Sequence, residues 1–255
     1  MATCKNCGKP LIISNGKCVY CGASTGLTSQ QISIERPAIR QSRPIKQRRS
    51  FANPSKSIRE LTIRVTSPNY DDIGQVLNQL GISYKPFNGN YNCDILFLNC
   101  GTGDHIDTNQ LRTFVQKGGI LYASDLTSSI VISTWPDLMM VNNNTSSCTI
   151  KANIMDPDLR QYLGNTIDVE FDLGSWSRII DASKGIVLMQ SEDAGFPIMM
   201  EFTIGQGKVF YTSFHNHAQT AEAEKKLLQL LVIKQVASAT KQDFRQTVAS
   251  MPISF

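Results

Sequence analysis

The pattern of apolar and polar positions changes along the chain, and each period predicts one type of element. Residues 60–67 alternate apolar and polar side chains, as a half-buried β-strand does. Residues 70–81 place their apolar side chains on one helical face and end on a glycine, which predicts a helix. Residues 82–87 predict a short second strand, and the continuous apolar run in residues 93–101 predicts a fully buried one.

The same order continues with another helix and another buried strand. Residues 107–119 predict a helix that two glycines close, and residues 120–125 predict a buried strand. Strands that are continuously apolar and alternate with helices are typical of a parallel α/β sheet.

The later half of the chain predicts mainly strands, followed by a last helix. The predicted strands are residues 147–154, 167–174, 185–192, 197–204 and 207–214. A Gly-Gln-Gly turn joins the last two as a hairpin, and residues 220–237 predict a helix with glutamates in its first turn. We therefore predict an α/β domain over residues 59–237, with a flavodoxin-like, parallel-rich sheet and an antiparallel β extension. Residues 238–255 show no clear pattern and are predicted to form a C-terminal tail.

Two Cys-x-x-Cys pairs lie in the first 24 residues. Each pair directs two thiolates at one point, and two pairs complete the tetrahedral sulfur shell that suits Zn²⁺. The predicted ligands are Cys4, Cys7, Cys18 and Cys21. The segment between the pairs contains an Asn-Gly turn and predicts a hairpin. So short a unit has no core, so one structural zinc ion would supply the folding energy of a zinc ribbon over residues 1–24. A redox pair of dithiols is the alternative, although no strand–helix context surrounds either pair.

The charge of the chain is unevenly distributed. The whole chain carries a net charge of +4, with +3 in residues 1–34, +6 in residues 35–60 and −5 in the remainder. Residues 25–58 lack periodicity and are rich in Ser, Gln, Pro and basic residues, which predicts a disordered basic linker. The linker is either a solvated tether or a contact for nucleic acid, an anionic lipid surface or an acidic protein patch. The side chains expected to contact a polyanion are Arg40, Arg43, Lys46, Arg48 and Arg49.

The longest apolar runs are far shorter than the roughly 20 residues that a membrane-spanning helix needs. The opening sequence MATCKNC lacks the basic and apolar regions of a signal peptide. We therefore expect no membrane span and a cytoplasmic location.

Polar and chemically active side chains follow the predicted parallel strands. Ligands bind beyond the carboxyl ends of strands in an open parallel sheet, so these side chains are expected to meet at one edge. The candidate ligand-binding residues are Asn99, Cys100, Gly101 and His217, and the candidate catalytic residues are Ser124, Asp125 and His215.

The two histidines near the end of the last strand admit three interpretations. They could share a metal ion with His105, Asp104 or Asp125 as the third ligand. His215 could instead activate Ser124 or Cys100 as a general base, with Asp125 fixing its tautomer. They could also only hold neighbouring loops together. On position alone, we expect His215 to point toward Asp125 and His217 to point away.

Three segments resemble the class I glutamine amidotransferase-like fold, and within it the trehalose-utilisation-type domains. They are DILFLNCG, LRTFVQKGGILYASD and GQGKVFYTSFHNHAQ, and the resemblance covers roughly residues 60–236. It implies a nucleophilic cysteine at an elbow after the fourth strand and a later histidine followed, two residues on, by glutamate. Here the elbow contains Ser124 and Asp125, and His217 stands where the glutamate would be. Cys100 falls at the oxyanion-loop position, so glutamine hydrolysis is not expected.

Two functions follow from these observations. The first is a non-enzymatic, bacterial binding or adaptor protein. Its ribbon and linker would dock on a protein or nucleic acid, and its degenerate amidotransferase-like domain would bind a ligand or partner. The second is a hydrolase that uses Ser124 or Asp125 with His215.

Overall fold

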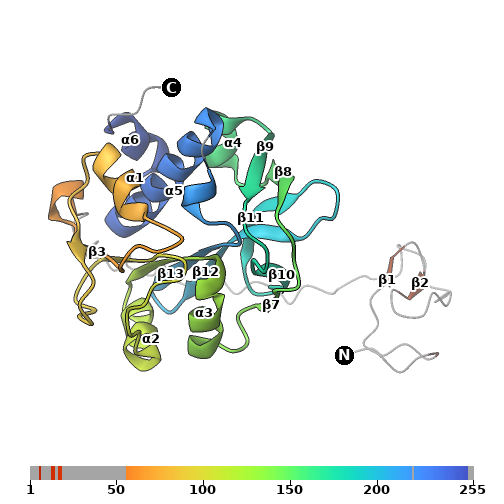
Figure 1. Cartoon of the computed structure of the whole chain (residues 1–255), viewed down its shortest axis with the longest axis horizontal. Coiled ribbons are helices and arrows are strands. Elements are labelled where there is room, and N and C mark those ends of the chain that lie inside the picture. Colours follow the sequence, from red (N-terminus) through yellow and green to blue (C-terminus); the bar gives the residue numbers. More distant parts are fainter. Residues whose placement is uncertain (1–5, 7–12, 15–16, 19–55, 220, 252–255) are drawn as a thin grey trace, which may run out of the picture. The chain divides into compact units, whose positions relative to one another are not determined.

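The structure is a computed structural model that describes residues 6, 13–14, 17–18, 56–219 and 221–251 (Figure 1). The chain divides into two compact units, residues 1–51 and 52–255. In the first unit, β1 (Ile13–Ser14) and β2 (Lys17–Cys18) pair in antiparallel register, Ile13 with Cys18. The arrangement of the four cysteine side chains and the predicted basic linker up to residue 55 lie outside the described residues.

The second unit is built on a nine-stranded sheet. In sheet order the strands are β4 (Lys85–Pro86), β3 (Ile63–Val65), β5 (Ile95–Leu98), β6 (Ile120–Ser124), β13 (Gly207–Thr212), β12 (Pro197–Ile204), β11 (Ile186–Ser191), β8 (Cys148–Ile154) and β9 (Thr166–Phe171). The pairs from β4 to β13 are parallel, and the pairs from β13 to β9 are antiparallel. This order confirms the predicted α/β fold with a parallel-rich sheet and an antiparallel extension.

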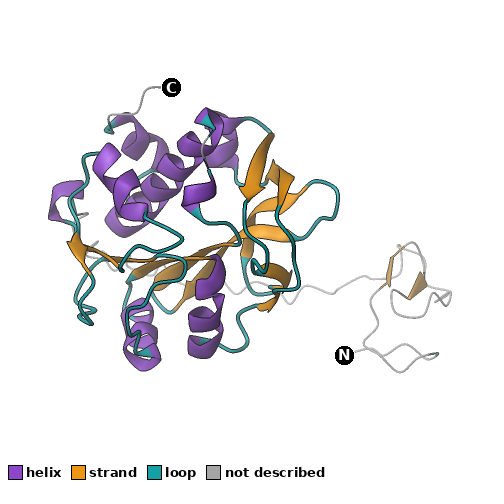
Figure 2. Ribbon diagram, viewed as in Figure 1, coloured by secondary structure: helices purple, strands orange, loops and turns teal. Residues whose placement is uncertain are grey.

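Helices cover both faces of this sheet (Figure 2). One face carries α1 (Ile73–Gln79), α4 (Pro157–Leu163), α5 (Glu222–Thr240) and α6 (Phe244–Ala249), and the other carries α2 (Thr108–Gln116) and α3 (Ser128–Thr134) (Figure 1). Two hydrophobic cores result. Along β5, Ile95 and Phe97 belong to the first core, whereas Leu96 and Leu98 belong to the second. The continuous apolar run of this strand follows from that arrangement, because side chains on both faces are buried.

The structure corrects the predicted C-terminal tail. Helix α5 continues to Thr240, and residues 244–249 form α6, whose side chains Phe244 and Val248 belong to the core that α5 helps to form. Asp243 starts α6 by accepting hydrogen bonds from two backbone N–H groups of its first turn. Only three of its six residues are buried, Phe244, Thr247 and Val248, and one of these is polar, so the apolar pattern is too sparse to predict a helix.

Several other elements were not predicted from the sequence. These are α3, α4, and the antiparallel pair of β7 (Met140–Asn142) and β10 (Arg178–Asp181). The described part of the unit also contains three single-turn helices: Ile58–Glu60, Asp125–Thr127 and Asn216–Ala218. Within the described residues, no helix is both long and apolar enough to cross a bilayer.

Candidate functional site

The carboxyl ends of β5, β6 and β13 bring three candidate residues together. One potential ligand atom from each of Cys100, Asp125 and His215 lies within 4.8 Å of the others, and all three residues are buried. The register of the three strands explains why these residues are close, because Leu98 pairs with Ala123 and Thr212 pairs with Ser124. Each of the three residues therefore follows its strand by one to three positions, at the same edge of the sheet.

His215 lies beside Asp125, as its position after the last strand predicted. Its Nδ1 atom is 3.6 Å from Asp125 Oδ2, and its Nε2 atom is 2.9 Å from Asp172 Oδ1. Burial lowers the pKa of His215, but the nearby carboxylates of Asp125, Asp71 and Asp172 outweigh it and raise the pKa above its usual value. His217 is exposed, as expected.

Asp125 occupies a constrained position directly after β6. Its φ of +40° is uncommon for a residue with a side chain. Its Oδ1 accepts a hydrogen bond of 2.7 Å from the Ser177 backbone N–H, and its carbonyl accepts one of 2.8 Å from the Tyr211 hydroxyl. These bonds hold the carboxylate toward Cys100 and His215. Backbone strain of this kind concentrates at functional sites.

Ser124 does not pair with His215 in the described hydrogen-bond network. Its side chain is fully buried, and its hydroxyl donates to Asp71 Oδ2. Nucleophilic catalysis by serine requires a base within hydrogen-bond reach of the hydroxyl. The predicted arrangement of Ser124 with His215 is therefore not formed.

Asp71 lies at this edge and, like Asp172, was not among the site residues predicted from the sequence. One of its oxygens accepts from the Ser124 hydroxyl and the Cys100 N–H, and the other accepts from the Asn216 N–H at 2.5 Å. The side chain is buried, and burial raises its pKa. The available signal was an aspartate doublet just after a strand end, which the helix pattern of residues 70–81 obscured.

The contacts of Asn99 and Gly101 stabilise the local fold. The Asn99 side chain donates to the Thr66 carbonyl and accepts from the Ile73 N–H, which fixes the start of α1 against β3. Gly101 has a φ of +72°, and a Cβ there would meet the Tyr70 ring at 2.4 Å. Both positions are therefore explained by the local fold.

Cys100 is a buried thiol. Its Sγ lies 3.7 Å from Asp125 Oδ2, to which it donates a weak hydrogen bond. Burial, reinforced by the Asp125 carboxylate, raises its thiol pKa far above the usual value. Since the thiolate is the reactive form, Cys100 is not an activated nucleophile at neutral pH in this environment.

The described residues do not bring two histidines together at one possible metal site. His217 and His105 are both exposed and do not join the group around His215. Asp104 instead accepts from the Ser67 backbone N–H at 2.6 Å and from the Ser67 hydroxyl at 3.2 Å. Of the three residues proposed as a third metal ligand, Asp125 is the one that lies beside His215 in the described part of the chain.

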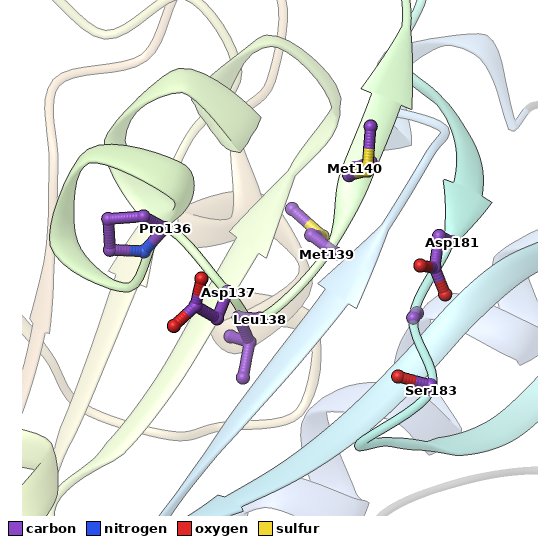
Figure 3. A pocket seen from close by; sticks show the side chains of 8 residues that line it. Pro136, Asp137, Leu138, Met139, Met140, Asp181 and Ser183 are labelled. Carbon is purple, nitrogen blue, oxygen red and sulfur yellow. The ribbon is translucent and has the colours of Figure 1, made fainter.

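A separate cavity lies beside β7 and β10 (Figure 3). Its volume is about 230 Å³, and its lining comes from residues 136–140 and 181–183. Met140 and Ile180 in these two strands are 57% and 52% exposed, respectively. Sequence patterning gave no sign of this surface, because the two strands are short and distant in the chain.

No known protein family and no curated protein matches this chain in sequence. Among solved structures, the chain is similar to a GMP synthase-type protein from Thermoplasma acidophilum, with 11% identity, a TM-score of 0.51 and coverage of 74% of this chain and 98% of that one. It is also similar to the mmIFT52 N-terminal domain, with 9% identity, a TM-score of 0.50 and coverage of 68% and 97%.

A third similar structure is the exo-beta-1,4-mannosidase Op5Man5 from Opitutaceae bacterium strain TAV5. Its identity is 12% and its TM-score 0.44, with coverage of 76% of this chain and 37% of that one. The chain spans about a third of the length of this and two similar β-galactosidases. The two structures with TM-scores of 0.50 and 0.51 show that the α/β unit shares their fold, and at 9–11% identity they show no activity.

Proposed function

We propose that this protein is a non-enzymatic binding or adaptor protein. The observation that carries the proposal is the burial of the side chains at the sheet edge where an amidotransferase-like domain would react. Cys100, Ser124 and Asp125 are almost fully buried, and their polar groups are engaged by neighbouring side chains and backbone. A reacting group must reach its substrate, so such a network is better suited to stabilising the sheet edge than to turnover.

The α/β unit would contact a protein partner through the surface of β7 and β10. Met140 is exposed and lines the cavity, and Ile180 is exposed on the strand paired with it; apolar side chains that are grouped at a surface mark protein contact sites. The N-terminal part would supply a second contact, with one structural Zn²⁺ held by Cys4, Cys7, Cys18 and Cys21. We further propose that the α/β unit is of the trehalose-utilisation type and that the protein is bacterial and works in the cytoplasm.

A hydrolase is the second candidate, and one observation favours it. Asp125 combines a strained backbone with a nearby imidazole, which are features of a nucleophile on an elbow. In this alternative, Asp125 or Ser124 would attack the carbonyl carbon of an ester, His215 would give a proton to the alcohol that leaves, and water would then release the acid from the acyl-enzyme. The burial of all three residues weighs against it.

Activity-based labelling and hydrolysis distinguish the two functions. A fluorophosphonate probe, which labels activated serines, should leave the wild-type chain unlabelled, because the Ser124 hydroxyl already donates to Asp71. Hydrolysis of p-nitrophenyl acetate should proceed at the same low rate in the wild type, Asp125→Asn and His215→Gln. Labelling that disappears in Ser124→Ala, or a rate that falls at least tenfold in either variant, would establish the hydrolase instead.

The proposed linker contact predicts a salt-dependent affinity for polyanions. Each neutralised phosphate releases counterions, so affinity for a fluorescent duplex DNA should fall steeply as salt rises. Joint replacement of Arg43, Lys46, Arg48 and Arg49 by alanine should weaken binding at low salt by about tenfold or more. Fluorescence anisotropy measures both effects. A matched variant that removes Lys225 and Lys226 of α5 should bind like the wild type, and equal affinity for all three chains would remove nucleic acid as a partner.

A further inference from the structure

The group of Cys100, Asp125 and His215 has the spacing of metal ligands. The Cys100 Sγ and His215 Nδ1 atoms lie 3.7 and 3.6 Å from the same oxygen, Asp125 Oδ2. Tetrahedral zinc, with bonds of about 2.3 Å to sulfur and about 2.0–2.1 Å to nitrogen and oxygen, separates its ligand atoms by roughly 3.3–3.6 Å. The two distances to Asp125 Oδ2 therefore lie within a few tenths of an ångström of that spacing, and the potential ligand atoms of Cys100 and His215 lie within 4.8 Å of each other.

Hydrogen bonding explains this spacing less well than coordination does. The 3.6 Å separation of His215 Nδ1 and Asp125 Oδ2 exceeds the usual range of about 2.7–3.2 Å for an N–H···O bond. A thiol donates only weakly, so the Asp125 oxygen between the two groups has no strong donor from either. A cation among the three atoms would satisfy all of them at once.

The chemical types of the three groups favour a borderline-soft divalent ion. A thiolate, a carboxylate and a neutral imidazole together carry two negative charges, which balance a divalent cation in a buried place. Thiolate and imidazole ligands select Zn²⁺ over Mg²⁺ or Ca²⁺, which prefer oxygen.

Asp172 supplies the outer contact that zinc-binding histidines commonly have. Its Oδ1 lies 2.9 Å from His215 Nε2, on the other side of the ring from Asp125. A carboxylate there favours the tautomer with its proton on Nε2, which leaves the Nδ1 lone pair directed at the group. The carboxylate of Asp172 thus orients the histidine as a ligand would need.

We propose that Cys100, Asp125 and His215 bind one Zn²⁺ ion, separate from the ion predicted in the N-terminal ribbon. The ion would join the ends of β5, β6 and β13, strands from three distant parts of the sequence. This site differs from a histidine pair in that His217 takes no part. It is independent of the proposed adaptor function, since a zinc ion at this edge could be present in either functional alternative.

Zinc content of the full chain tests the site. We expect two zinc ions per wild-type chain by native mass spectrometry and elemental analysis after purification without chelators. Cys100→Ser and His215→Gln should each contain one ion fewer than the wild type. Cys148→Ser is the matched control, because it removes an exposed thiol far along the chain from the group, and it should keep the wild-type content.

A second chain keeps the test decisive if the cluster variants fail to fold. Replacing all four N-terminal cysteines by serine leaves the α/β unit unaltered, and this chain should still retain one zinc ion. Loaded with Co²⁺, it should show the near-ultraviolet absorption of a single cobalt–thiolate bond. No zinc and no cobalt–thiolate absorption in this chain at tenfold metal excess would overturn the proposal and leave the three residues as a hydrogen-bonded network.

Discussion

Replacing Asp71 by alanine should lower the free energy of unfolding of the α/β unit by about 3 kcal/mol. The change leaves the Cys100 N–H, the Asn216 N–H and the Ser124 hydroxyl without their acceptor in a buried place. Each buried donor that loses its partner costs about 1–3 kcal/mol. The total is expected near the lower end of the sum, because the variant also removes a carboxylate whose burial is itself unfavourable. Urea unfolding followed by circular dichroism measures the effect.

The adjacent Asp72 provides the control for this experiment. It is less buried, and its carboxylate accepts one side-chain hydrogen bond, from Gln75 at 3.0 Å. Asp72→Ala should therefore change stability by less than about 1 kcal/mol. Equal losses in the free energy of unfolding for the two variants would show that the hydrogen-bonded network at the sheet edge does not depend on Asp71. This result would count against a structural role for the buried edge.

Replacing Phe244 by alanine should cost about 3–4 kcal/mol, as large-to-small changes of buried aromatic residues do. The ring is 6% exposed, lies 5.9 Å from the Tyr162 ring between centroids, and has Lys234 Nζ 5.3 Å above it. The variant would therefore leave a cavity between α6, α4 and α5. The variant should unfold at a lower temperature and at a lower urea concentration than the wild type, each time in one cooperative transition.

The exposed neighbour Arg245 tests whether this loss is specific to packing. Arg245→Ala should remain within about 0.5 kcal/mol of the wild type, because surface changes away from special contacts have small effects. Wild-type stability in Phe244→Ala would mean that residues beyond Thr240 behave as the tail that the sequence alone suggested.

The local pattern of the chain and its long-range contacts determine different parts of this fold. Alternation and apolar runs located the strands of the sheet, because side-chain period is a local property and burial on both faces leaves a continuous apolar run. The same patterns located α1, α2 and α5 and predicted the parallel-rich sheet with its antiparallel extension. They missed α3, α4 and α6, which are six or seven residues long; α1 is also seven residues long, so length alone does not separate the helices that were found from those that were missed.

The candidate site shows the same division. The sequence by itself determined that Asn99, Cys100, Asp125 and His215 follow strands whose carboxyl ends share an edge, and position along β13 was enough to direct His215 toward Asp125. Only the tertiary structure decided what each group contacts. Asp71 approaches from the start of α1 to accept the Ser124 hydroxyl, and Asp172 approaches from beyond β9 to meet His215. Such contacts join residues more than 40 positions apart, and they depend on loop paths and sheet twist that no local period encodes.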